Sequence, residues 1–291
     1  MPVDVVGLGA CNIDFLQKVP RFVKPDDEVE IKNLQLSVGG SASNFAVGLS
    51  RLNINSGILA RIGNDYFGEL AIKEFKKEGV NTERLLKTSL KTGKVFIAIE
   101  PNGERSMYTF IGANKKFKLK KEDIEYIKSS KILHITQMYK EVVEKASKNA
   151  NILSFNPGPI LSSFGINKLE KIIEKTDILF LNKKEMEILT GMNISNGVSS
   201  LLDIGAKIII ITCREQGAVV YTKKDRIYAP SKKVKVVDTT GAGDSFAAGF
   251  ISAFFRNKSL KESLNYANLV ASYCVGKCGA LNTPNYTELD L

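Results

Sequence analysis

The apolar positions along the chain follow two rhythms, one typical of strands and one typical of helices. Short apolar runs of strand length lie at residues 132–135, 152–155, 178–181 and 208–212. Segments with helical spacing lie between and after them, near residues 140–149, 166–175, 183–190 and 197–205. This alternation predicts a parallel sheet that is covered by helices on both faces.

The two ends of the chain extend this pattern. Further strands are expected at residues 3–9, 28–38, 218–221, 226–228 and 234–237, and a hairpin at 94–111 turns at 101–104. Further helices are expected from residue 43, from Asp65 to Gly79, and near 242–255 and 260–276. Since no repeat or long linker divides the chain, we expect one doubly wound α/β domain over residues 1–291. A small β lid, formed by about 12–37 and 92–113, is expected over the carboxyl ends of the parallel strands.

Composition places the chain among ordinary globular proteins, with 291 residues, 44% hydrophobic and 25% charged. No run approaches the ~20 apolar residues that span a bilayer, and the first residues lack a basic segment followed by an apolar one. We therefore expect a cytoplasmic protein with no membrane partner. The four cysteines (Cys11, Cys213, Cys274 and Cys278) form no metal-binding pattern with the single His134, so free thiols are expected.

The formal net charge of +10 favours anionic partners without choosing among them. The densest basic run, residues 115–121, contains five lysines and could serve as a nucleic-acid patch. Acidic residues follow it at once and no nucleic-acid motif accompanies it. We therefore interpret it as a solvated connection before a helix and expect no nucleic-acid partner.

The strongest chemical signal is the segment Asp-Thr-Thr-Gly-Ala-Gly-Asp at residues 238–244, which lies between an apolar run and a helix. Gly241 and Gly243 let the backbone approach an anion closely, and the free amides of Gly241, Ala242 and Gly243 and the positive end of the helix then point at that charge. Asp244 is poorly suited to holding phosphate, but it suits a base that accepts the proton of an attacking hydroxyl. The alternative is an N-capping aspartate after a flexible turn.

This segment resembles the signature of the ribokinase-like sugar kinases, the PfkB family, and other family motifs occur in the expected order along nearly the whole chain. Residues 9–14 resemble the first substrate motif, in which Asn12 and Asp14 would contact the acceptor. Residues 39–44 resemble the second, in which Gly39 and Gly40 admit the sugar and Asn44 binds a hydroxyl. The resemblance implies an ATP-dependent kinase with Asp244 as catalytic base and an anion-binding turn at residues 241–243.

The segment Asn182-Lys183-Lys184-Glu185 matches the family's Asn-x-x-Glu motif. The resemblance implies that Glu185 helps to hold Mg²⁺ through water and that Asn182 lies near the nucleotide phosphates. An ordinary capping box at a strand-to-helix junction has the same spacing.

Residues 212–217 occupy the place of the family's Thr-x-Gly-x-x-Gly nucleotide loop and retain Thr212 and Gly217, but Arg214 replaces a glycine. We therefore expect nucleotide binding with an altered donor preference among ATP, GTP and ADP. By the same resemblance Asn268 would border the adenine pocket, although it could equally pack a helix. A monovalent cation such as K⁺ would involve Asp238 and Thr240.

Ribose or a nucleoside is the favoured acceptor, because residues 112–114 resemble those branches of the family. The aromatic and apolar side chains that could flank the acceptor, or could instead pack the lid, are Phe96, Tyr108, Phe110, Met138 and Tyr139. A phosphorylated acceptor, such as fructose 6-phosphate or ribose 1-phosphate, is the alternative; it needs basic residues, of which Arg105 is the obvious candidate. Because a small lid cannot bury both faces, a homodimer is expected.

Other functional classes have weaker support. Residues 7–12 partly imitate a dinucleotide fingerprint, which would indicate an NAD-dependent oxidoreductase, but Asn12 replaces the small residue needed there and no helix follows. No Walker-type Gly-x-x-x-x-Gly-Lys sequence occurs. A non-catalytic ligand-binding relative would have no use for Asp244 behind an anion-binding turn.

Overall fold

The computed structural model describes residues 3–277 and 279–289, and its main feature is a large sheet. The strands of this sheet are β1 (Val5–Leu8), β4 (Ser56–Gly63), β5 (Asn81–Thr88), β8 (Ile132–Thr136), β9 (Ile152–Asn156), β10 (Ile178–Asn182), β11 (Ile208–Thr212), β12 (Ala218–Tyr221) and β13 (Arg226–Ala229). Their order is β13-β12-β11-β10-β9-β8-β1-β4-β5. Neighbours from β11 to β5 are parallel, whereas β12 and β13 are antiparallel. The predicted doubly wound, mostly parallel sheet is therefore confirmed.

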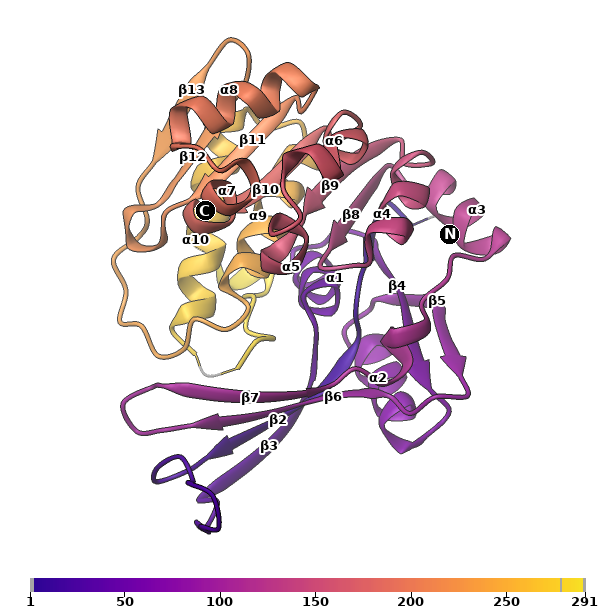
Figure 1. The fold of residues 1–291 in the computed structure, drawn as a ribbon, viewed down its shortest axis with the longest axis vertical. Helices are drawn as coiled ribbons and strands as arrows, with labels where there is room; N and C mark the ends of the chain where they lie inside the picture. The colour runs from indigo at the N-terminus through magenta and orange to yellow at the C-terminus, as the bar shows by residue number, and fades with distance from the viewer. Residues whose placement is uncertain (1–2, 278, 290–291) are drawn as a thin grey trace.

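A second, small sheet lies below the carboxyl ends of the parallel strands in the view of Figure 1. It is made of β2 (Asn12–Lys18), β3 (Asn33–Gly39), β6 (Gly93–Ile99) and β7 (Arg105–Phe110), in the order β3-β2-β6-β7. These strands come from the two chain segments in which the sequence predicted a β excursion. The central pair, β2 and β6, is parallel and both outer pairs are antiparallel.

Helices cover both faces of the large sheet (Figure 1). They are α1 (Ser41–Arg51), α2 (Tyr66–Lys77), α3 (Lys121–Ser129), α4 (Lys140–Ser147), α5 (Gly158–Ser162), α6 (Ile166–Ile173), α7 (Lys183–Thr190), α8 (Ile194–Ile204), α9 (Ala242–Phe255) and α10 (Leu260–Val275). Short 3₁₀ turns occur at η1 (Gly112–Lys116), η2 (Arg214–Gln216) and η3 (Tyr286–Glu288).

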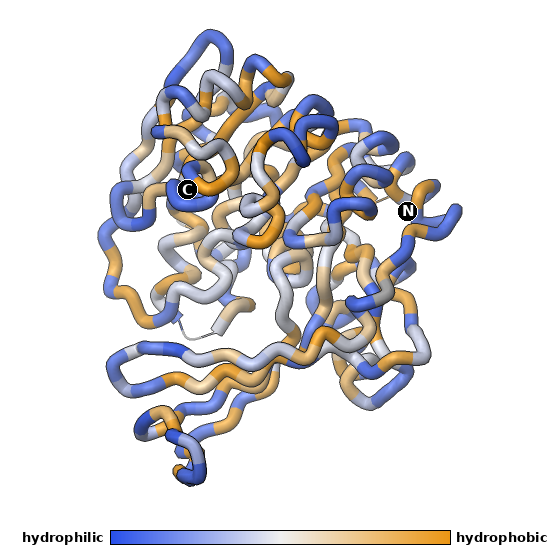
Figure 2. Tube along the Cα trace, viewed as in Figure 1, coloured by the Kyte–Doolittle hydropathy of each residue, from blue (hydrophilic) through white to orange (hydrophobic). Residues whose placement is uncertain are grey.

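Two buried clusters explain this layering. One packs the apolar sides of α3, α4, α6, α7 and α8 against the sheet, and the other packs α1, α9 and α10 against its opposite face. Figure 2 shows the most hydrophobic segments along the central strands and the most hydrophilic ones in outer turns and helix ends. Because each parallel strand is buried on both sides, its sequence is a nearly continuous apolar run, which is why the sequence revealed β8 to β11 so clearly.

Several local predictions were incomplete or wrong. Strands β4 and β5 were missed, because buried Arg61 and Arg84 interrupt their apolar patterns; both pair with Asp123 of α3. The strand expected at 28–38 begins at residue 33. The strand expected at 234–237 is absent: Val234, Val236 and Val237 are exposed, and this segment lies beyond the edge strand β13.

The basic run at residues 115–121 is the predicted connection before a helix, and α3 begins at Lys121. Its two apolar residues, Phe117 and Leu119, are buried against the core, whereas Lys115, Lys118, Lys120 and Lys121 are exposed. Cys11, Cys213 and Cys274 are free, and Cys278 lies outside the described residues. Among the described residues, no helix combines the length and apolarity needed to cross a bilayer.

Candidate active site

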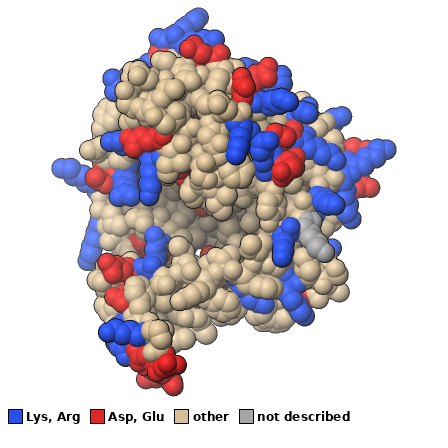
Figure 3. All heavy atoms as spheres, viewed as in Figure 1, with Lys and Arg blue, Asp and Glu red and all other residues tan. Residues whose placement is uncertain are grey.

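Two polar side chains that are far apart in the sequence, Asn44 and Asp244, meet, and a third, Asp14, lies against Gly39 just before the helix that carries Asn44. Asp14 lies on β2, Asn44 lies in the first turn of α1, and Asp244 lies in the first turn of α9. The chain links them compactly, because Gly39 packs against Asp14 and the amide of Asn44 bonds to the carbonyl of Gly40. Figure 3 shows the molecule hollowed between the two sheets on this face, with most Lys and Arg side chains outside the hollow.

Asp14 is held against glycine at the end of β3. The pairing of β2 with β3 brings the two strands together, and a Cβ on Gly39 would lie 2.1 Å from an Asp14 carboxylate oxygen. Any other residue at position 39 would displace this carboxylate. Asp14 is 7% exposed, and burial raises its pKa to about 6. A buried carboxylate of this kind is a strong hydrogen-bond acceptor for a polyol.

Asp244 is oriented by two neutral donors. The side-chain nitrogen Nδ2 of Asn44 donates to Oδ2 of Asp244 over 2.7 Å, and the nearby hydroxyl of Ser41 is a second donor that lowers the pKa of the Asp244 carboxyl group. Burial of the carboxyl group raises the pKa of Asp244 to about 7, and the two donors act in the opposite direction. A carboxylate whose pKa lies near neutrality is suited to accept a proton and release it again.

Two buried side-chain oxygens at this site have no hydrogen-bond partner among the described residues: Oδ1 of Asp14 and Oδ1 of Asn44. Buried acceptors are normally satisfied, because leaving one unpaired costs about 1–3 kcal/mol. Both belong to residues that the sequence predicted to bind the acceptor. Donor groups of a bound polyol would satisfy them.

The predicted anion-binding turn leads directly into α9. Gly241 is the residue before the helix and has φ of 74°, and the position of a Cβ on Gly243 is open, with no heavy atom within 4 Å. The turn is anchored at its start, where Oδ1 of Asp238 accepts bonds from the amide and hydroxyl of Thr240 and Oδ2 accepts one from the amide of Gly279. Among the described residues, the amide of Ala242 donates to the carbonyl of Thr239 over 3.2 Å, whereas those of Gly241 and Gly243 have no such bond, so the two glycine amides at the positive end of α9 can bind a phosphoryl group.

Arg105 of β7 joins the small sheet to this turn. Its guanidinium donates to Oγ1 of Thr240 and lies 3.5 Å from Oδ1 of Asp238. These contacts occupy the two residues that the resemblance assigned to a monovalent cation, and the guanidinium already supplies positive charge there. The arrangement therefore does not favour K⁺ bound to Asp238 and Thr240.

The residues predicted for the nucleotide side lie at the ends of adjacent parallel strands. Asn182 ends β10, Thr212 ends β11, and the two are paired in register. Asn182 and Glu185 form a reciprocal capping box at the start of α7, with bonds of 2.8 and 3.0 Å. Oε2 of Glu185 accepts from the backbone, so Oε1 can accept from the water shell of Mg²⁺, and the residues present fit that ion.

In the loop after Thr212, residue 214 has a backbone conformation that favours glycine, although the residue is arginine. Arg214 has φ of 51°, in the left-handed region, and its side chain is exposed. Gly217 follows with φ of 93°. Asn268 is buried on α10 and donates to the carbonyls of Ala229 and Pro230 over 3.1 Å each, which ties the helix to the chain after β13. Its predicted place beside adenine stays a prediction.

Asn12 is fixed by a residue that the sequence did not single out as a site residue. The side chain of Asn114, just after the small sheet, donates to Oδ1 of Asn12 over 2.9 Å and to the carbonyl of Cys11 over 3.1 Å. It also accepts from the amide of Cys11. Asn114 therefore positions the start of β2 relative to the rest of the small sheet.

The suggestion that lid aromatics flank the acceptor is wrong for three of them. The strand register aligns Phe15, Phe96 and Tyr108 on one face of the small sheet, and Phe110 lies on that face two residues further along β7. Asp14 and Arg105 lie on the opposite face, which is turned toward the large sheet. Met138 is buried in the core, so Tyr139, which is exposed, is the remaining aromatic candidate.

Two polar residues near Asp244 were missed by the sequence interpretation, Ser41 and Gln137. Nε2 of Gln137 donates to Oγ of Ser41 over 3.2 Å. Gln137 directly follows β8, at the carboxyl end of a parallel strand, and that position was the available signal.

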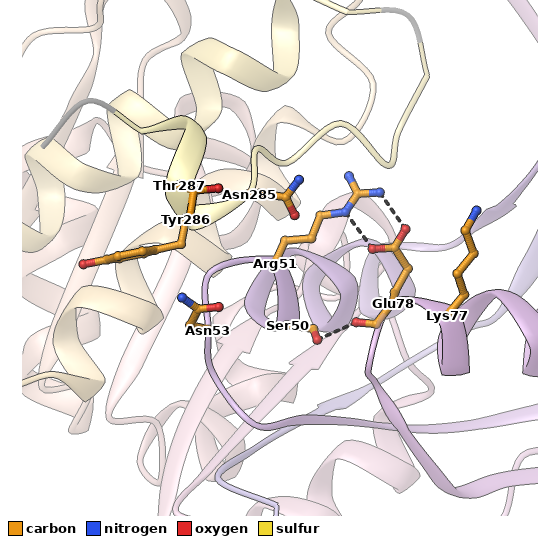
Figure 4. A pocket seen from close by; sticks show the side chains of 8 residues that line it. All are labelled: Ser50, Arg51, Asn53, Lys77, Glu78, Asn285, Tyr286 and Thr287. Carbon is orange, nitrogen blue, oxygen red and sulfur yellow. Dashed lines mark hydrogen bonds and ion pairs between the residues drawn. The ribbon is translucent and has the colours of Figure 1, made fainter.

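A separate pocket of about 320 Å³ lies at the other end of α1 (Figure 4). Its lining side chains are Ser50, Arg51, Asn53, Lys77, Glu78, Asn285, Tyr286 and Thr287. None of them is a predicted site residue. Figure 4 shows that the Arg51 guanidinium pairs with the Glu78 carboxylate instead of facing an open space.

Comparison with known proteins agrees with the geometry. The pfkB family carbohydrate kinase model matches residues 3–287. A nucleoside kinase of Methanocaldococcus jannaschii is 30% identical, over 97% of this chain and 94% of its own length. An ATP-dependent ribose-1-phosphate kinase of Halopiger xanaduensis is 28% identical, over 97% and 95%. A ribokinase structure from Thermotoga maritima superimposes with a TM-score of 0.90 at 29% identity, over 99% of this chain and 98% of that one. A family match over nearly the whole chain, together with this fold, establishes that the protein belongs to the pfkB family of carbohydrate kinases, phosphotransferases with hydroxyl acceptors.

Proposed function

We propose that the protein transfers the terminal phosphoryl group of ATP to a hydroxyl of ribose or a nucleoside, with Asp244 as the catalytic base. The observation that carries this proposal is the position of Asp244. Its carboxylate lies at the amino end of α9 beside the anion-binding turn and is oriented by Asn44, whose helix follows directly after the Gly39 that packs against Asp14. A base, an anion cradle and acceptor-binding groups are the parts that such a transfer requires.

In the proposed reaction, the side chains of Asp14 and Asn44 orient the acceptor. Its hydroxyl oxygen forms a bond to the terminal phosphorus, the bond from that phosphorus to the bridging oxygen breaks, and ADP leaves. The hydroxyl proton moves to the Asp244 carboxylate. The amides of residues 241–243 stabilise charge on the transferring group. Mg²⁺ near Glu185 and Asn182 would neutralise charge on the nucleotide phosphates.

Electrostatics favour an uncharged acceptor. Asp14 and Asp244 are both acidic residues of the proposed site, and an acceptor phosphate beside them would experience like-charge repulsion. Arg105 is the cation that reaches the site from the small sheet, but its guanidinium is engaged by Thr240 and Asp238. This arginine and the similarity to a ribose-1-phosphate kinase favour a phosphorylated acceptor, so a ribose 1-phosphate or fructose 6-phosphate kinase is the second candidate.

One acceptor screen separates the two candidates. The protein is incubated with ATP, Mg²⁺ and ribose, nucleosides, hexoses, ribose 1-phosphate or fructose 6-phosphate, and ADP formation is measured beside the Asp244→Asn variant. We expect turnover with ribose or a nucleoside, and a loss of about 10²- to 10⁴-fold in the variant with nucleotide binding retained. Turnover confined to sugar phosphates supports the second candidate, and near-normal turnover of Asp244→Asn removes the assigned base.

We also propose that the small sheet acts as a lid and that its outer face pairs with a second copy of the chain. Leu34, Leu36, Phe96, Tyr108 and Phe110 on that face are each at least 37% exposed. Phe67 of α2 packs against Phe15 on this face, and the side chains that stay exposed on it are available to another molecule. A monomeric mass by light scattering at working concentration would exclude the dimer.

A further inference from the structure

Gln137 stands out because its backbone is in an unusual conformation beside the candidate base. It directly follows β8 and has φ of 47°, in the left-handed backbone region that residues other than glycine rarely adopt. Such conformations persist where the surrounding structure imposes them, and they are frequent at functional sites.

The neighbouring loop is built to accommodate this conformation. A Cβ on Gly158 would lie 2.6 Å from Cγ of Gln137, so only glycine at position 158 leaves room for the side chain. Asn156 fixes both segments, because its carbonyl accepts from the amide of Gln137 at 3.3 Å and its Oδ1 accepts from the amide of Gly158 at 2.9 Å. Two residues, Asn156 at the end of β9 and Gly158 at the start of α5, therefore constrain Gln137 and its side chain.

The directed side chain ends at Ser41. Nε2 of Gln137 donates to Oγ of Ser41 over 3.2 Å, and the Ser41 hydroxyl lies near enough to the Asp244 carboxyl group to lower its pKa as a donor. A hydroxyl has a single proton to donate. When its oxygen accepts a bond from Gln137, that proton is left to point at Asp244.

We propose that Gln137 is a positioning residue of phosphoryl transfer, which acts through the Ser41 hydroxyl to hold the Asp244 carboxylate in its productive orientation. This role rests on the proposed function, because it requires Asp244 to be the base. Gln137 itself need not touch the acceptor. It fixes the direction of the Ser41 proton, and Ser41 together with Asn44 then fixes the carboxylate.

The other charged and titratable groups around Asp244 do not stabilise its ionised form, so neutral hydrogen-bond donors must do so. Asp14 lies on β2, Asp238 lies at the start of the turn, and the Cys274 thiol of α10 is close enough to interact with Asp244. Arg105, from the small sheet, is paired with Asp238 and Thr240. Among the described residues, no ion pair joins a cation to Asp244, so its ionised form depends on Asn44 and Ser41.

The test compares three variants with the wild type across pH. Gln137→Gly removes the side chain and suits the observed backbone. Gln137→Glu keeps the shape but accepts a bond from Ser41, which draws the hydroxyl proton away from Asp244. Ser41→Ala removes the relay itself. Asn53→Gly is the matched control, because Asn53 has φ of 57° at the far end of α1.

We expect kcat at pH 7 to fall by about 3- to 10-fold in Gln137→Gly and further in Gln137→Glu, with recovery at higher pH, because each change disfavours ionised Asp244. The midpoint of the kcat profile should shift to higher pH in the order wild type, Gln137→Gly, Gln137→Glu. The melting temperature of Gln137→Gly should not fall, since glycine adopts this backbone without strain. Asn53→Gly should leave the profile unchanged.

Two results overturn the proposal. One is a wild-type kcat profile in both Gln137 variants; the other is a loss of kcat that accompanies a lower melting temperature and no shift along the pH axis, which is the signature of a purely structural residue. The Asp244→Asn variant distinguishes a failure of the proposed base from a failure of the positioning role of Gln137. If it retains normal turnover, the proposed base fails, whereas if it is inactive and the Gln137 variants behave as wild type, only the positioning role fails.

Discussion

The side-chain nitrogen of Asn44 lies 2.7 Å from a carboxylate oxygen of Asp244, although the two residues are 200 positions apart in the sequence. This bond joins the first turns of α1 and α9, which pack against each other on one face of the large sheet. It uses one oxygen of the carboxylate, so the other is available to an acceptor hydroxyl. The bond also makes the ionisation of Asp244 sensitive to Asn44.

The pH dependence of turnover should report that bond. The pKa of Asp244 is raised to about 7 by burial, and the base must be ionised to accept a proton, so kcat should rise as pH increases through about 7. Asn44→Leu removes a donor that favours the carboxylate, and we expect the rise to move to higher pH. Steady-state kinetics between pH 5.5 and 9 measure this. A rise at lower pH in the variant would contradict the assignment.

Arg105 should control closure of the small sheet over the acceptor. Among the described residues, its bond to Thr240 is the hydrogen bond that links the β6–β7 hairpin to the anion-binding turn. We expect Arg105→Ala to raise KM for the acceptor by about 5- to 10-fold, the value of one charge-assisted hydrogen bond. ATP affinity measured without acceptor should change little. Arg226→Ala removes an equal charge at the start of β13 and serves as the control.

Arg214 should strain the nucleotide loop and influence donor choice. Because its φ of 51° suits glycine better, we expect Arg214→Gly to raise the free energy of unfolding by about 0.5–1 kcal/mol. The exposed guanidinium is also free to contact a donor phosphate, so the ratio of activities with ATP, GTP and ADP should change. Urea unfolding and a donor comparison check the two effects. An unchanged donor ratio would remove the recognition role.

His134 should make the fold sensitive to acid. It is buried between Phe45 and Phe180, its Nδ1 lies 2.8 Å from Oγ of Ser154, and burial lowers its pKa from 6.5 to about 3. The unfolded chain takes up a proton below pH 6.5 and the folded chain does not, so stability should fall as pH drops from 6.5 toward 3. This contribution amounts to about 2 kcal/mol between pH 6.5 and 5.

Asp14 and Asp244, whose pKa values are raised by burial, affect stability with the opposite sign. Their contribution to stability is present at low pH and is lost as pH rises from the unfolded pKa of 3.8 through the folded pKa of about 6 for Asp14 and about 7 for Asp244. The effect of His134 is therefore measured as the difference between wild type and a variant in their loss of stability on acidification. Unfolding at pH 7.5 and pH 5 is compared for wild type and a His134→Phe, Ser154→Ala double variant, in which the acid-induced loss should be smaller. An equal loss in both proteins would argue against the buried neutral imidazole.

The pair of Arg51 and Glu78 should stabilise the C-terminal segment. Two bonds of 2.8 Å join them (Figure 4). The same guanidinium donates to the carbonyls of Leu281 and Thr283. Since both side chains are about one-fifth exposed, we expect Glu78→Ala to lower the free energy of unfolding by about 1–3 kcal/mol.

Glu74→Ala is the matched control, because its contact with Lys77 on the same helix is 3.9 Å long and exposed, and it should cost under about 1 kcal/mol. The pKa of Glu78 is lowered by Arg51, so the effect of Glu78→Ala should be present at neutral pH and vanish in acid, as the carboxylate takes up a proton. Equal losses of unfolding free energy in the two variants at pH 7 would show that the bidentate pair stabilises the protein no more than the exposed contact does.

The sequence by itself determined the parallel sheet, the helices that cover it and the anion-binding turn before α9. These are properties of short segments, because periodicity and glycine placement act over a few residues. It could not reveal β4 and β5, whose arginines are buried only because Asp123 of a distant helix receives them, and it suggested a strand at 234–237 that has no neighbour to pair with.

At the site, the motifs identified Asp14, Asn44 and Asp244, but only the tertiary structure decided which atoms face one another. The strand register turned Phe96 and Tyr108 away from the acceptor and turned Arg105 toward Thr240. The packing of α1 against α9 and β8 brought Ser41 and Gln137 to the base. Such relations depend on how strands align and helices pack. No local pattern in the chain encodes the contacts of Arg105 with Thr240 and of Gln137 with Ser41, because each joins residues about one hundred or more positions apart.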